Sequence, residues 1–231
     1  MINKLKKNKL KNNYKKAQAL KSRTILPLIF IFLNLINSIL TKRLSNNMRK
    51  LSTCLSINLR ILGGNKIKVI NPKYIPDRIY INGNKSTIDK YGRIITDTDD
   101  SYYVTLEWDE KRKNYDNLFE DLNRILEIDL SNFDTTGVTS MNYMFFNCYS
   151  LYYINFTNFD TSSAISMNSM FENCFDLLSL DLSSFDTRKV ETMNYMFRSC
   201  HLLDFLNLSN FYTPALREMN EMFGDCRNIR Y

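Results

Sequence analysis

The chain has 231 residues and a formal net charge of +7 at pH 7, from 31 basic and 24 acidic residues and one histidine. Residues 1–76 hold 17 of the basic residues and no acidic residue, which leaves residues 77–231 with 14 basic and 24 acidic residues, a net charge of −10. Nucleic-acid-binding domains carry basic residues on their folded surface, so this distribution argues against nucleic acid as a partner. The chain has a single histidine, His201, so no Ser or Cys nucleophile has a recurring base near it, which argues against a His-dependent enzyme.

The first 60 residues form a basic segment around one apolar run, residues 25–40. Nine Lys or Arg residues lie between Lys4 and Arg23, ahead of this run. A basic stretch followed by an apolar one is typical of a signal peptide or a signal anchor. We therefore expect a cell-surface or extracellular protein that contacts the membrane through the apolar run. A mitochondrial-type presequence and a chance result of Lys/Asn/Ile-rich composition are the alternatives.

Residues 61–124 are predicted to form a β-rich N-terminal cap. Three segments have the composition of strands: residues 66–70, 78–81 and 102–108. Asn82-Gly83, directly after the second of them, is a strong signal for a hairpin turn. Residues 117–125 align with residues 143–151 at an offset of 26, which indicates a degenerate first repeat at the end of this region.

A 26-residue unit occurs four times without an insertion from Ile125 to Asn228, and residues 125–231 therefore hold four repeats and the start of a fifth. Each copy opens with apolar residues at positions one, four and six, which suits a strand. Each copy closes with an apolar residue (Val, Ala or Leu), two Met residues, a Phe and a Cys. Most of these residues are three or four positions apart along the chain, a spacing that predicts one apolar face of a short helix. We expect an α/β, leucine-rich-repeat-like right-handed solenoid with a parallel sheet on one face and short helices on the other.

The repeat pattern LxxLxLSxFDTxxVxxMxxMFxxCxx resembles that of the BspA-like leucine-rich repeat surface proteins, with the Met-x-x-Met-Phe segment as its most specific element. The resemblance covers Ile125 to Asn228, a little under half of the chain. It implies a curved solenoid displayed outside the cell, with adhesion or host and matrix binding as the function. The chain departs from ordinary leucine-rich repeats at the ninth position, where Asn or Cys is replaced by Phe: Phe133, Phe159, Phe185 and Phe211.

No catalytic, cofactor or metal site is predicted. One cysteine recurs at the same position of every copy, which predicts a structural ladder of buried free thiols: Cys148, Cys174, Cys200 and Cys226. A disulfide framework is the alternative for an exported protein. Three Asp-Thr pairs recur as well, and we expect their carboxylates to cap loops rather than to bind cations: Asp134, Asp160 and Asp186.

The positions that vary between copies lie on the outward side of the predicted strands. There we predict a candidate concave binding face: Tyr152, Tyr153, Asn155, Asp181, Asp204, Phe205 and Asn207. Aromatic residues flanked by carboxylates are suited to anchor a protein or glycan ligand, although a simply solvated sheet is the alternative. Three N-x-S/T sequons also occur, and glycans at the last two would compete with a ligand for this face: Asn84, Asn155 and Asn207.

These observations favour a non-enzymatic, exported or surface-anchored repeat protein that recognises a protein or glycan. Recurring positions carry core and turn chemistry, whereas a catalytic group is normally needed only once. A self-assembling surface-coat or scaffold protein is the first alternative, because the last repeat offers an open apolar end for self-association. A membrane-tethered intracellular repeat domain is the second.

Overall fold

The computed structural model describes residues 55–96 and 100–229, so the predicted export segment at residues 25–40 lies outside the described residues. The described residues belong to one unit, Ser52–Tyr231. Within the described part of the chain, no helix is both long enough and apolar enough to cross a membrane.

The N-terminal part of this unit consists of strands and one short 3-10 helix, Pro72–Tyr74. Its strands are β1 (Leu55–Leu62), β2 (Ile67–Lys68), β3 (Arg78–Ile81), β4 (Asn84–Lys85), β5 (Arg93–Ile94) and β6 (Ser101–Trp108). Strand β1 alternates buried and half-buried residues and pairs antiparallel with β6 on one side and β7 on the other. Asn82 and Gly83 join β3 to β4 with φ angles of 49° and 80°, the left-handed conformation that an Asn-Gly hairpin turn requires.

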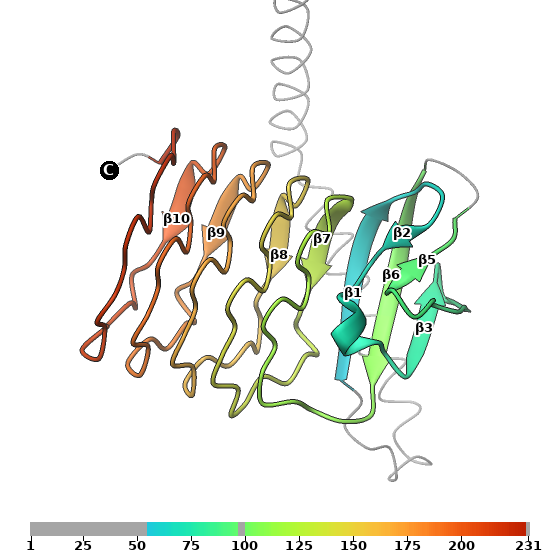
Figure 1. The fold of residues 1–231 in the computed structure, drawn as a ribbon, viewed down its shortest axis with the longest axis horizontal. Helices are drawn as coiled ribbons and strands as arrows, with labels where there is room; N and C mark the ends of the chain where they lie inside the picture. Colours follow the sequence, from blue (N-terminus) through green and yellow to red (C-terminus); the bar gives the residue numbers. More distant parts are fainter. Residues whose placement is uncertain (1–54, 97–99, 230–231) are drawn as a thin grey trace, which may run out of the picture. The chain divides into compact units, whose positions relative to one another are not determined.

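Each repeat contributes one short strand, and Figure 1 shows these strands side by side in chain order. They are β7 (Ile125–Asp129), β8 (Tyr153–Asn155), β9 (Ser179–Asp181) and β10 (Phe205–Asn207). Strand β8 pairs parallel with β7, and β10 pairs parallel with β9. Strands β8 and β9 belong to different sheets, so β8 ends a mixed six-stranded sheet of order β4-β3-β6-β1-β7-β8 and β9 and β10 form a second, two-stranded sheet.

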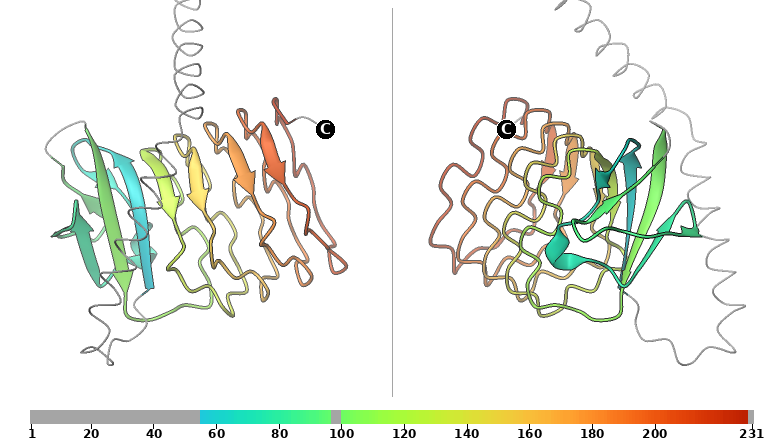
Figure 2. Two further views of the ribbon diagram at one scale, coloured as in Figure 1. Left: turned by 180° about the vertical axis from the view of Figure 1, so that it is seen from behind. Right: turned by 45° about the vertical axis from the view of Figure 1, so that its right-hand side comes forward.

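Neighbouring repeats are joined most regularly through the methionine segment. Alternate N–H groups there donate to the next repeat: Met141 N to Ser166 O, Tyr143 N to Asn168 O, Phe145 N to Met170 O and Asn147 N to Glu172 O, at 2.9–3.1 Å. Equivalent bonds follow in the next two repeats, and they begin before the first one, at Asn117 and Phe119. Figure 2 shows the resulting loops, one behind another. This lateral register of equal positions holds the repeats together.

The predicted helices on the face opposite the strands are absent from the described residues. Each copy of the methionine segment contains two residues of positive φ, for example Tyr143 at 57° and Asn147 at 60°, which an α-helix of L-residues does not accommodate. Its internal bonds are three-residue turns, such as Phe146 N to Tyr143 O and Cys148 N to Phe145 O. A succession of tight turns thus brings the Met, Phe and Cys side chains inward at nearly the spacing of a helix face.

The predicted α/β, leucine-rich-repeat-like right-handed solenoid is therefore wrong. The described residues form strands and turns, with antiparallel and parallel pairs in a mixed sheet and no α-helix. The backbone N–H groups that would close a helix are used instead for bonds to the next repeat.

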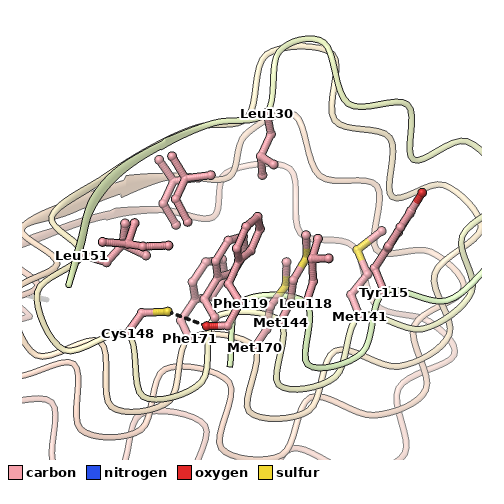
Figure 3. Close-up of a cluster of buried hydrophobic side chains, with 14 of the residues drawn as sticks. Tyr115, Leu118, Phe119, Leu130, Met141, Met144, Cys148, Leu151, Met170 and Phe171 are labelled. Carbon is pink, nitrogen blue, oxygen red and sulfur yellow. Dashed lines mark hydrogen bonds between the residues drawn. The ribbon is translucent and has the colours of Figure 1, made fainter. Parts of the chain in front are cut away.

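One core runs from the N-terminal strands through the repeats. Its spine is a stack of near-parallel rings with neighbouring centroids 5.3–5.6 Å apart: Phe119, Phe145, Phe171, Phe197 and Phe223. Figure 3 shows part of this stack between the methionines and Leu151, with Leu130, which directly follows β7, nearby. At the N-terminal end, Trp108 packs its ring edge on Phe133 and donates its indole N–H to the carbonyl of Tyr74.

A ladder of side chains that sequence reasoning missed runs beside the methionines. The Oδ1 atom of Asn142 accepts the backbone N–H of Asn168, and the bond repeats from Asn168 to Asn194 and from Asn194 to Asn220, at 2.7–2.8 Å. Asp116 begins this series by accepting the N–H of Asn142. The signal was present, because Asn follows the first Met of every copy. These amides supply partners for N–H groups that the turns leave unpaired.

The burial of the methionines provides a matched pair for testing the core. Met193 is 1% exposed, whereas Met219, at the same position of the next repeat, is 59% exposed. Met193→Ala should lower the free energy of unfolding by about 2–5 kcal/mol, and Met219→Ala by less than about 0.5 kcal/mol. Chemical denaturation measures both changes. Equal losses would show that the last repeat is packed like the others.

The asparagine ladder is tested by Asn168→Ala. This change leaves the N–H of Asn194 without its acceptor and should lower the free energy of unfolding by about 1–3 kcal/mol. Asn228→Ala, at an exposed position, is the control and should change little. A small effect of Asn168→Ala, measured by the same denaturation method, would contradict a stabilising role for the ladder.

Candidate binding surface

Pairing between strands sets one row of outward side chains across the sheets. In this row Tyr103 of β6 lies opposite Arg60 of β1, Arg60 opposite Glu127 of β7, and Glu127 opposite Tyr153 of β8. In the second sheet, Ser179 and Phe205 are paired at the equivalent positions. Directly opposed residues on neighbouring strands point to the same side. We call this side, together with the adjoining outward positions of β7 to β10, the outer strand face.

Three aromatic side chains of the row are exposed. Tyr103 is 63% exposed, Tyr153 46% and Phe205 57%. The sequence predicted the last two as binding residues but missed Tyr103, which follows the alternation of β6 opposite the buried Val104 and Leu106. That alternation could have indicated its outward side. The placement of β6 two strands from the first repeat, however, depends on long-range pairing through β1.

Tyr152 is held in a polar cluster rather than free to meet a ligand. One Arg60 Nη1 atom donates to Glu127 Oε1 at 2.7 Å and to the Tyr152 hydroxyl at 3.0 Å, and that hydroxyl donates to Glu127. Burial, followed by the hydrogen bond to Glu127, raises the pKa of Tyr152 to about 12. The bond to Glu127 also raises the pKa of Arg60. The cluster ties β1 to the first two repeats.

Three of the predicted positions, Asn155, Asp181 and Asn207, form with Asp129 a second row whose side chains cap turns. Asn155 Nδ2 donates to Asp129 Oδ1 at 2.9 Å, and Asn207 Nδ2 donates to Asp181 Oδ1 at 3.0 Å. Each of these four residues also accepts the N–H of the residue two positions later. Hydrogen bonds from Ser183 lower the pKa of Asp181. Asp181 and Asp204 are nevertheless exposed and place carboxylates on the outer strand face.

The three sequons differ in their surroundings. Asn84 is an exposed residue of β4, next to the hairpin turn. The side-chain amides of Asn155 and Asn207 are hydrogen-bonded along the outer strand face, as described above. A glycan on Asn155 or Asn207 would replace one hydrogen of a side-chain amide that donates to a neighbouring aspartate. Asn84 is therefore the most accessible of the three.

The repeat cysteines are free and lie in line, each thiol donating to the carbonyl of a phenylalanine in the preceding repeat. The Sγ–O distances are 3.1 Å from Cys148 to Phe119, 3.2 Å for each of Cys174 and Cys200, and 2.9 Å for Cys226. Figure 3 shows the first of these bonds. Burial raises the pKa of Cys148 to about 12, which disfavours the reactive thiolate. Cys226 is half-buried and departs from the expected burial.

The Asp-Thr pairs act within the fold. Asp134, Asp160 and Asp186 each accept the N–H of the residue two positions later, as expected for loop caps. The buried hydroxyl of Thr135 donates to Asp160 O and accepts from Asp160 N, and two further threonines repeat this bridge. Among the residues that the structure describes, no group of three or more His, Cys, Asp or Glu side chains could hold a metal ion.

His201 belongs to a surface stack of rings. Its ring lies on Phe175 with centroids 4.7 Å apart, and Phe175 in turn stacks on Tyr149 at 4.9 Å. Its Nε2 atom lies 2.9 Å from Asp225 Oδ2. These contacts indicate that His201 has a structural role at the surface.

The described chain is thus a stack of equal 26-residue repeats, closed on one side by antiparallel strands, with an aromatic and acidic outer strand face. Residues 113–231, about half of the chain, match a family described as "Mycoplasma protein of unknown function, DUF285", and the chain belongs to this family. No curated protein and no solved structure matches the chain.

The thiols can be tested by alkylation in a Cys54→Ser background, which leaves four of the five cysteines. Cys226 should react with iodoacetamide in the native protein, because it is half-buried. Cys148, Cys174 and Cys200 should react only after denaturation without a reductant. Mass spectrometry of the labelled peptides gives the result. Failure of these three to react after unfolding would indicate disulfides.

Proposed function

We propose that this protein is a non-enzymatic recognition protein, exported or held at a membrane through residues 25–40, which binds a protein or glycan on its outer strand face. The family to which it belongs is associated with BspA-like repeat proteins. The resemblance of the repeat to those surface proteins supports export and an adhesion-like role. The basic and then apolar order of the N-terminal segment supports the same location.

The observation that carries this proposal is the row of exposed aromatic rings on strands whose backbones are fixed. The solvent-facing rings of Tyr103, Tyr153 and Phe205 project from paired strand positions. Tyrosine and phenylalanine supply large contact areas, and side chains on a rigid frame lose little conformational entropy on binding. The residue type in the row changes between neighbouring strands, which suits a surface that recognises a particular ligand.

A self-assembling scaffold is the second candidate, and the last repeat favours it. Met219 and Phe223 are exposed there, and β10 has one strand partner, β9, among the described residues. Apolar side chains beside a half-paired strand can pack against another copy. Light scattering over a range of concentrations separates the candidates, because a recognition protein of the first kind does not need to assemble.

The recognition proposal is tested with the Ser52–Tyr231 unit, which contains the whole described core. The unit is applied to a panel of defined oligosaccharides and to immobilised extracellular-matrix proteins. At least one probe should bind. Tyr153→Ala and Phe205→Ala should each weaken that binding about tenfold or more, as expected for aromatic anchors that become buried under a bound ligand. Tyr212→Ala, an exposed aromatic residue outside the outer strand face, should leave the affinity unchanged.

Two results would contradict the proposal. One is that no probe binds, and the other is that Tyr212→Ala weakens binding as much as the two face variants do. Unfolding curves of all three variants serve as a control, because a lost fold would mimic a lost surface. The location is tested separately by protease treatment of intact cells, which should digest the repeat region if it is outside.

A further inference from the structure

We propose that the ligand of the outer strand face is a basic polypeptide segment in an extended conformation, with Lys or Arg side chains over Tyr153 and Phe205 and beside Asp181. This inference rests on the proposed recognition function and specifies the chemistry of the ligand. Three observations support it: the negative charges on the face, the exposed rings that lie beside these charges, and the spacing of the rings.

The outer strand face carries an excess of negative charge over the repeats. Leu126, Glu127 and Asp129 and the equal positions of the next three copies make twelve outward positions at or next to the repeat strands, and these include four acidic residues and no basic residue. The acidic ones are Glu127, Asp129, Asp181 and Asp204. Residues 125–229 as a whole hold 13 acidic and 5 basic residues, so no nearby surplus of positive charge compensates. An anionic ligand such as a nucleic acid or an acidic glycan would be repelled.

The hydrogen bonds on this face leave the charges of Asp129 and Asp181 unneutralised. Glu127 is paired with Arg60. Asp129 and Asp181 instead accept hydrogen bonds from neutral amide groups, which orient the carboxylates without cancelling their charge. A cationic group at Asp181 would therefore meet a charge that is fixed in position and still open to solvent.

The exposed rings add a second preference for cations. An ammonium or guanidinium group over the face of an aromatic ring is attracted by its quadrupole, and a nearby carboxylate adds a charge-assisted hydrogen bond. A neutral sugar could stack on Tyr153 and Phe205 but would gain no charge interaction from Asp181. The combination thus favours Lys and Arg side chains over neutral ligands.

The spacing of the rings limits the conformation of the ligand. Tyr153 and Phe205 occupy equal positions two repeats apart, and the stacked core rings of these successive repeats lie 5.6 and 5.5 Å apart, so the two positions are roughly 10–11 Å apart. A polyproline II segment rises about 3.1 Å per residue with three residues per turn. Residues three apart on such a segment point to the same side about 9 Å apart. A basic residue at every third position therefore matches both rings at once.

The test uses a fluorescein-labelled nonapeptide of three Lys-Pro-Ser units, with fluorescence anisotropy on the Ser52–Tyr231 unit at low ionic strength. A peptide with Glu in place of Lys should not bind. A peptide of the same composition with its three Lys residues adjacent should bind more weakly. Tyr153→Ala and Phe205→Ala should each weaken binding of the Lys-Pro-Ser peptide about two- to fivefold.

Two variants of equal charge change separate a fixed site from general attraction. Asp181→Asn keeps the Oδ1 acceptor of its turn but removes the charge, and it should weaken binding. Glu110→Gln, at an exposed position after β6, removes the same charge elsewhere and should have little effect. If the two variants weaken binding equally and the aromatic variants do not matter, the peptide is attracted only by net charge and the inference is overturned.

A neutral oligosaccharide, maltoheptaose, distinguishes failure of this inference from failure of the proposed function. If maltoheptaose binds, Tyr153→Ala abolishes that binding and the basic peptide does not bind, then recognition by the outer strand face is supported and the basic ligand is ruled out. If neither of these probes nor any probe of the panel above binds in a way that depends on Tyr153, both the inference and the site on which it rests are overturned.

Discussion

The lateral hydrogen bonds between the methionine segments of neighbouring repeats, each from an N–H group to the carbonyl 25 residues later, are the constraint on which the rest of the structure depends. Alternate N–H groups of the methionine segment point at the next repeat, for example from Phe145 to Met170. A single inserted residue would offset every later partner in that repeat, which is why four copies of 26 residues follow without a gap. The same bonds explain the positive φ angles at Tyr143 and Asn147, because a right-handed helix would direct these groups along its own axis.

This register determines which side chains meet. Equal positions lie about one strand spacing apart, so a residue type that repeats must tolerate its own copy as a neighbour. Phenylalanine rings, thiols and amides do so by stacking or by donating to the next copy. In the strand row carboxylates alternate with amides, and Asp129 and Asp181 are each bonded to an asparagine of the following repeat. Positions that make no such contact, such as Tyr153 and Phe205, are free to differ.

The sequence allowed the period, the inward Leu, Met, Phe and Cys positions and the Asn82-Gly83 turn to be predicted, because each depends on local spacing or turn chemistry. The prediction of helices was wrong for a physical reason. Apolar residues three and four positions apart fit one face of a helix and a run of tight turns equally well. Tyr143 adopts a left-handed backbone conformation, but tyrosine is not a residue whose presence in a sequence predicts a turn. Tyr103 and Arg60 joined the candidate site through antiparallel pairs that span 43 and 67 residues, which no local pattern encodes. The export segment stays a prediction.

The two ends of the repeat stack differ, and this difference affects the two aromatic anchors unequally. Strand β1 covers β7, and Arg60 reaches from it to Glu127 and Tyr152, so the strand that carries Tyr153 is held against a completed sheet. Phe205 lies on β10, which among the described residues pairs with β9 alone, and Met219 of the same repeat is exposed whereas Met222 is buried. Local opening is easiest where buried contacts are few. Tyr153 is therefore supported by a six-stranded sheet, whereas Phe205 depends on the single pair of β9 and β10.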